Sequence, residues 1–148
     1  MEHGGYFAYH PTHEYAHRQI RRMLIAVAHG SRNPEWRTSV ERQFESLQGE
    51  LGADRLQLAY MDLAPPTLMD VVEATVQHGV TRIRVFPLFL AVEGHVTNDI
   101  FPLLDEVRRA FPTADIQMLS PLGQQPMFRD MLRSLANDDS NVTGIDDD

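Results

Sequence analysis

The stretch LIAVAHGSRNPEW, residues 24–36, decides how this chain folds. Residues 23–28 form an unbroken apolar run, which is typical of a strand buried on both faces of a sheet. Asn33 can cap a helix that has Pro34 at its first position. The strand therefore ends at His29, and only three small or basic residues separate it from the helix. A histidine in this place indicates either a tight turn or a site.

The same succession of an apolar strand and an amphipathic helix recurs along the chain. Further strands are predicted at residues 56–61, 81–90 and 114–119. The helices that follow them are predicted to begin at Pro66, at Asn98 or Asp99, and at Pro126. Such alternation implies a parallel sheet with helices on both faces, joined by right-handed crossovers. We therefore predict an α/β, flavodoxin-like domain with four parallel strands in the order 2-1-3-4.

Composition narrows the class of protein. The chain has 148 residues, the size of one ordinary domain, and contains no cysteine. The absence of cysteine excludes a disulfide scaffold, thiolate zinc sites, iron–sulfur clusters and a cysteine nucleophile. The formal net charge of −8 argues against nucleic acid as a partner. No apolar segment is long enough to span a bilayer, and the first 17 residues contain no secretory signal, so we expect a cytoplasmic protein.

Three regions can be distinguished. Residues 1–21 are rich in Gly, His and Tyr without a clear period, and we expect a flexible N-terminal extension. Residues 22–136 carry the alternating pattern and form the predicted domain. Residues 137–148 contain five aspartates and no basic residue, which predicts an acidic, disordered tail.

The predicted strand order places a candidate site. Ligands of such sheets bind where the order reverses, beyond the carboxyl ends of strands 1 and 3. His29 ends strand 1 and His95 follows strand 3, while Asp62 ends the neighbouring strand 2. Imidazole suits divalent iron, cobalt, nickel and zinc, and it accepts protons near neutral pH. Two histidines and a carboxylate could hold a metal ion and leave positions open for a substrate.

Plainer interpretations remain for the same residues. A histidine followed by glycine at a strand end is often a turn residue, and Asp62 could brace the turn after it. Gly30 and Ser31 could let a helix N-terminus approach an anion, with Arg32 as a carboxylate or phosphate partner. The chain lacks a G-x-S-x-G elbow at Ser31, a dinucleotide glycine fingerprint and a Walker lysine.

Three segments together resemble a known family. They are AHGSRNPEW (28–36), AYMDLAPPTLMDVV (59–72) and GVTRIRVFPLFLAVEGHVTNDI (79–100). They are similar to the small CbiX-type sirohydrochlorin chelatases, members of the class II chelatases, and the resemblance covers residues 22–136. It implies a single chelatase-like lobe that inserts a divalent metal into sirohydrochlorin without ATP, in cobalamin or sirohaem biosynthesis. The metal, cobalt or iron with nickel also suitable, is then a substrate, and no organic cofactor is implied.

The resemblance also implies roles for individual residues. His29 and His95 correspond to the catalytic, metal-handling histidines, with Asp62 as a third metal ligand where the family often has glutamate. Glu93 stands where the family usually has the first of two glycines before the second histidine. The candidate substrate-binding residues are Ser31, Arg32 and Gly94.

The small family members pair as homodimers, so the resemblance implies a symmetric dimer. Two other functions remain open. One is a non-catalytic domain that carries a metal or a tetrapyrrole to a partner. The other is a small hydrolase that uses a phosphate pocket at Gly30 and Ser31.

Overall fold

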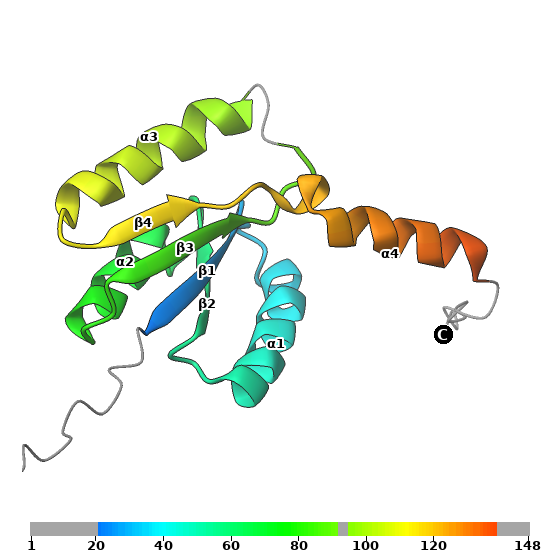
Figure 1. Cartoon of the computed structure of the whole chain (residues 1–148), viewed down its shortest axis with the longest axis horizontal. Coiled ribbons are helices and arrows are strands. Elements are labelled where there is room, and N and C mark those ends of the chain that lie inside the picture. Colours follow the sequence, from blue (N-terminus) through cyan, green and yellow to red (C-terminus); the bar gives the residue numbers. More distant parts are fainter. Residues whose placement is uncertain (1–20, 92–94, 139–148) are drawn as a thin grey trace, which may run out of the picture.

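The computed structural model describes residues 21–91 and 95–138, with residues 95–97 described by their backbone only. The elements in chain order are β1 (Arg22–Ala28), α1 (Pro34–Leu51), β2 (Leu56–Tyr60), α2 (Leu68–Gln77), β3 (Arg82–Pro87), α3 (His95–Ala110), β4 (Asp115–Met118), the 3₁₀ helix η1 (Leu122–Gln124) and α4 (Pro126–Asn137). The strands pair in parallel in the order β2-β1-β3-β4 (Figure 1). The predicted fold class and strand order are confirmed.

The predicted flexible extension at residues 1–21 and the predicted acidic tail at residues 137–148 lie almost wholly outside the described residues, so both stay predictions. Within the described ranges, no helix is long and apolar enough to cross a membrane.

Two helices begin at other residues than the sequence pattern predicts. α2 begins after Thr67 rather than at Pro66, because Thr67 and Asp70 form a capping box. The Thr67 hydroxyl accepts from the Asp70 N–H, and the Asp70 carboxylate accepts from the Thr67 N–H at 2.8 Å. This reciprocal pair satisfies two N–H groups of the first turn, which proline cannot do. α3 begins at His95, three residues before Asn98.

The sheet has helices on both faces, as predicted. Alternate residues of β1 point to opposite faces, which a strand buried on both sides requires. Ile25 and Val27 pack in one apolar cluster with residues of α2 and α3. Ala26 and Ala28 belong to a second cluster, against which Phe44 of α1 packs. The carboxyl end of β1 is therefore held from both sides, and this is the end that carries the candidate site.

α4 leaves most of its apolar side uncovered, and α1 also exposes Trp36, Leu47 and Leu51. In Figure 1 α4 projects beyond the end of the sheet rather than lying on a face. Met127 is 80% exposed, and Met131, Leu132 and Leu135 are each 49–50% exposed. The apolar stripe that the sequence places on this helix exists, but no described part of the same chain buries it.

Candidate functional site

His29 stands at the carboxyl end of β1, as the sequence predicts. The strand ends at Ala28, and the side chain of His29 is exposed. The imidazole lies against the ring of Phe89, with ring centroids 4.4 Å apart and an angle of 40° between the planes. Within the described residues, no side chain or backbone group forms a hydrogen bond with this imidazole. Its nitrogens are therefore available to a metal ion or a proton.

Asp62 lies on the same edge, next to His29. The Met61 N–H donates to the Ala28 carbonyl at 2.9 Å, and the Asp62 N–H donates to the His29 carbonyl at 3.4 Å. The loop after β2 is thus joined to the end of β1 by backbone hydrogen bonds. The Asp62 carboxylate is exposed. The predicted placement is confirmed, whereas a role as metal ligand stays a prediction.

Gly30 makes this approach of the two loops possible. Its φ angle is +94°, a left-handed conformation that side chains rarely adopt. A Cβ atom at this position would collide with the carbonyl oxygen of Asp62 and would lie 3.3 Å from the Cβ atom of Tyr60. The glycine therefore serves packing between the β1 and β2 loops.

The turn into α1 is organised by two polar side chains. The Ser31 hydroxyl oxygen accepts from the Asn33 N–H at 3.0 Å, and the Asn33 side chain accepts from the Glu35 N–H at 2.9 Å. Asn33 is the N-cap and Pro34 opens the helix, which confirms both predictions. Arg32 is exposed and forms no ion pair within the described residues. Its guanidinium is free to meet an anion at this edge.

His95 is described only as the first residue of α3. Its side chain lies outside what the structure describes, and so do Glu93 and the candidate substrate contact Gly94. The chain that leads to them leaves the sheet beside β1, since the Leu88 N–H donates to the Val27 carbonyl at 2.8 Å. The route from β3 to His95 therefore begins at the edge that holds His29.

The described part of the site offers two candidate metal ligands, His29 and Asp62. Among residues whose side chains the structure describes, no group of three His, Asp or Glu side chains is arranged to hold a metal ion. A site built from His29 and Asp62 needs a further ligand, which a histidine at position 95 could supply.

The sequence pattern missed a buried tyrosine beneath the site. Tyr60 is fully buried, and its hydroxyl donates to Glu41 Oε1 at 2.9 Å. Burial, followed by this hydrogen bond, raises the pKa of Tyr60 to about 12. The phenol therefore remains protonated at neutral pH and supports the loop instead of serving as a base. Tyr60 lies in the apolar run LQLAY, where a tyrosine is expected to be an ordinary core residue, so the sequence alone did not predict its hydrogen bond to Glu41.

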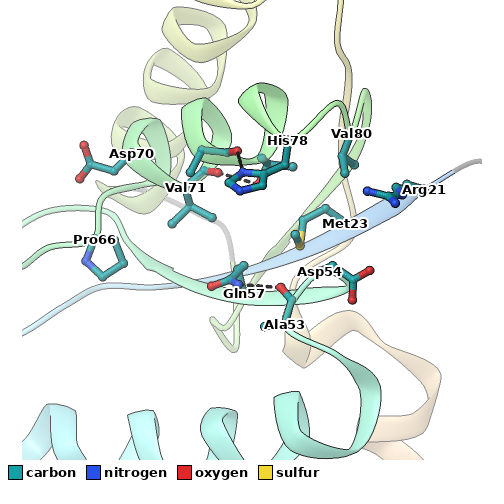
Figure 2. A pocket seen from close by; sticks show the side chains of 12 residues that line it. Arg21, Met23, Ala53, Asp54, Gln57, Pro66, Asp70, Val71, His78 and Val80 are labelled. Atoms are coloured by element: carbon teal, nitrogen blue, oxygen red, sulfur yellow. Dashed lines mark hydrogen bonds between the residues drawn. The ribbon is translucent and has the colours of Figure 1, made fainter.

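A cavity that His29 does not border runs along α2, from Pro66 and Asp70 to His78. It has a volume of about 470 Å³ and opens between α2 and β2 (Figure 2). His78, on its wall, has Nδ1 2.7 Å from the Ala74 carbonyl oxygen, a contact that ends α2. Asp70, also on the wall, belongs to the capping box. Both of these side chains bond to the ends of α2; Arg21, Asp54 and Gln57 also line the cavity, but neither His29 nor Asp62 borders it.

Known proteins with related sequences point to one family. The CbiX family profile matches residues 23–139. The sirohydrochlorin ferrochelatase of Priestia megaterium is 27% identical over 124 residues, which cover 84% of this chain and 46% of that protein. The sirohydrochlorin cobaltochelatase of Methanosarcina barkeri is 26% identical over 116 residues, or 74% of this chain and 89% of that protein. The chain thus spans about half the length of the ferrochelatases it matches.

Solved structures agree in fold. A CbiX protein from Marinobacter aquaeolei VT8 superposes with a TM-score of 0.68 and 27% identity, covering 78% of this chain and 94% of that one. SirB from Bacillus subtilis, with Fe³⁺, superposes with a TM-score of 0.66 over 79% of this chain and 45% of its own. At 23% identity, the second likeness concerns the fold alone.

Proposed function

The chain belongs to the CbiX family, and from this premise we propose that it inserts a divalent metal ion into sirohydrochlorin without ATP. The family match over residues 23–139 carries the proposal, because it takes in nearly all of the described sheet and its helices. Relatives named ferrochelatase and cobaltochelatase share sirohydrochlorin as substrate and differ in the metal. Cobalt and iron are accordingly the metals we propose, with nickel as a further candidate, in cobalamin or sirohaem biosynthesis.

His29 and His95 are the catalytic pair in this proposal. Metal insertion replaces the pyrrole N–H protons of the macrocycle, so the site must deliver M²⁺ and take up protons. Imidazole can do both near neutral pH. The exposed imidazole of His29, without a hydrogen-bond partner in the described residues, supports this role. The start of α3 at His95 supports a second histidine that approaches the same edge.

Asp62 is proposed as the third metal ligand, directly or through a water molecule. Aspartate is shorter than the glutamate that the family often has, and the backbone bond to His29 compensates by keeping the two residues adjacent. A carboxylate beside two imidazoles suits a site that binds a divalent metal and then releases it.

The substrate carries many carboxylates, whereas the chain has a formal net charge of −8. Local donors must therefore offset the overall repulsion. We propose that Ser31, Arg32 and Gly94 bind the macrocycle, together with the first N–H groups of α1. The Ser31 hydroxyl accepts a bond from Asn33 and keeps its own hydrogen to donate. The exposed guanidinium of Arg32 can pair with a carboxylate.

A second copy of the chain completes the enzyme in this proposal. The chain is about half as long as its ferrochelatase relatives, so two copies would supply what those proteins carry in one chain. The uncovered apolar side of α4 supports a symmetric homodimer, because a partner subunit could bury it. We further propose a domain at residues 22–136, with a flexible extension before it and an acidic tail after it, in a cytoplasmic protein.

An anaerobic insertion assay tests the function. The full chain is mixed with sirohydrochlorin and Co²⁺, Fe²⁺ or Ni²⁺, and the absorbance change of the macrocycle is followed against the uncatalysed rate. A related porphyrin serves as the control substrate. Catalytic turnover with sirohydrochlorin supports a chelatase. Stoichiometric binding of metal or macrocycle without turnover would instead identify a carrier domain, and phosphatase activity that survives chelation would favour the hydrolase.

A further inference from the structure

His29 is held differently from most histidines that handle metals. In typical sites, the ring nitrogen that faces away from the metal donates to a carboxylate or carbonyl, which fixes the ring. No described residue forms such a bond with His29. Its imidazole contacts the ring of Phe89 instead, at 4.4 Å between centroids. The orientation of this histidine therefore depends on an aromatic neighbour.

Phe89 is well placed to hold another ring. It is only 6% exposed, and its backbone is fixed on both sides. The preceding residue, Leu88, donates to the Val27 carbonyl at 2.8 Å, and the Phe89 carbonyl accepts from the Gly123 N–H at 3.0 Å. Phe89 thus lies just after β3 with its backbone fixed, and His29 lies just after β1. Because β1 and β3 are neighbouring strands, the two rings come into contact.

The support extends to η1. A Cβ atom at Gly123 would collide with the carbonyl oxygen of Leu90, so only glycine lets η1 approach the segment after β3 so closely. Figure 1 shows η1 beside the end of β3. Contacts therefore run from η1 through Phe89 to the imidazole of His29.

We propose that Phe89 is a positioning residue, which orients the imidazole of His29 through ring contact and leaves both ring nitrogens free. A hydrogen bond in place of the ring would fix the histidine equally well but would occupy one nitrogen. With the aromatic contact, the ring is held in place and no described protein group competes with the metal for either nitrogen. This proposal rests on the proposed role of His29 in metal insertion.

The test compares three substitutions. Phe89→Leu keeps most of the apolar volume and removes the ring, whereas Phe89→Tyr keeps the ring. Phe86→Leu is the matched control, because Phe86 is half-buried on β3 and forms no ring contact with His29 among the described residues. NMR of histidine-labelled protein measures the carbon-bound imidazole protons of His29, and the insertion assay measures KM for the metal and for sirohydrochlorin.

We expect the ring-current shift of the His29 protons to disappear in Phe89→Leu and to persist in Phe89→Tyr and Phe86→Leu. The KM for metal should rise about tenfold in Phe89→Leu, as when an orienting neighbour of a ligand is lost, with little change in the KM for sirohydrochlorin. Phe89→Tyr should restore the wild-type value. If Phe89→Leu does not fold, Phe89→Met fills the space without a ring and takes its place.

An unchanged His29 shift in Phe89→Leu would overturn the proposal, and so would a lost shift with an unchanged KM for metal. Failure of the proposed function gives a different result. In that case His29→Ala inserts metal as well as the wild type does, whatever the NMR spectra of the Phe89 variants show.

Discussion

Gly30 lies so close to Asp62 that a single methyl group at Gly30 would collide with the Asp62 carbonyl oxygen. The same glycine has a φ of +94°, which disfavours any side chain there. Two loops that carry candidate site residues are thus packed backbone against backbone. The relationship ties the geometry of the site to the stability of the fold.

We expect Gly30→Ala to lower the free energy of unfolding by about 2 kcal/mol, from backbone strain and displacement of the Asp62 loop. Urea denaturation measures this. Gly49→Ala is the matched control, because Gly49 lies within α1 and a Cβ there meets nothing within 4 Å. Alanine at that position should stabilise the protein by about 0.5–1 kcal/mol. Equal stability of Gly30→Ala and wild type would show that the loops can separate freely.

Removing either of the two histidines proposed as catalytic should abolish most of the insertion activity. His29→Ala and His95→Ala are each expected to lower kcat by roughly 10²–10⁴-fold, the usual contribution of a positioned proton acceptor. The absorbance assay with sirohydrochlorin measures the rate, and circular dichroism checks the fold. His78→Ala is the control, since His78 lies at the opposite end of the strands and should leave the rate unchanged. Full activity in His29→Ala would show that the proposed site is wrong.

Asp62→Asn tests the carboxylate without disturbing the loop, because the backbone bonds of Asp62 to His29 and Ala64 remain. We expect the KM for metal to rise about tenfold and stability to stay the same. Asp62→Glu should recover most of the loss. If Asp62→Asn binds and inserts metal like the wild type, the side chain serves only the turn.

The fold could be predicted because the central strands contain short apolar segments that alternate with amphipathic helices along the chain. β1 reads as continuous apolar sequence since both of its faces are buried, and the helix after it carries its own cap at Asn33. Strand order then placed His29 and Asp62 on one edge, and the backbone bond between them confirms it. Periodicity and capping are local properties, so one sequence suffices to read them.

The contact between His29 and Phe89 could not be predicted in this way. It depends on the register of β1 against β3, which pairs Val27 with Pro87. His29 and Phe89 each lie two residues beyond this pair, so the register brings them side by side. Nothing in either segment alone specifies that register. The close approach of Gly30 to Asp62 likewise depends on tertiary packing. A glycine after a strand predicts a turn, but it does not show which other segment packs against that turn.

Tyr60 makes stability sensitive to alkaline pH. Burial and the bond to Glu41 raise the pKa of Tyr60 to about 12, whereas an unfolded tyrosine ionises near ~10. The folded state therefore holds the proton more tightly, and the resulting stability is present below about pH 10 and lost between about pH 10 and 12. Tyr60→Phe should lose about 1 kcal/mol at pH 8. Urea denaturation should show a smaller further loss between pH 8 and 11 than in the wild type; equal losses would contradict the assignment.

The exposed apolar side of α4 provides a test of the proposed homodimer. The periodicity of α4 shows which side is apolar but not which molecule covers that side, so the sequence alone could not tell packing within the chain from packing against a partner. A partner subunit would bury Met131 and Leu135, which are 49% and 50% exposed in the single chain. We therefore expect the wild type to be a dimer at micromolar concentration, as measured by light scattering after size exclusion.

In this last test Leu135→Asp should shift the dimer to monomer, because a carboxylate placed in an apolar interface loses its hydration without gaining a partner. Asn137→Asp is the control, since it adds the same charge to the same helix away from the apolar stripe. If the interface also completes the site, Leu135→Asp should lose insertion activity at low protein concentration while Asn137→Asp keeps it. A wild-type monomer with full activity would show that one copy of the chain suffices, and that the exposed side of α4 serves another purpose.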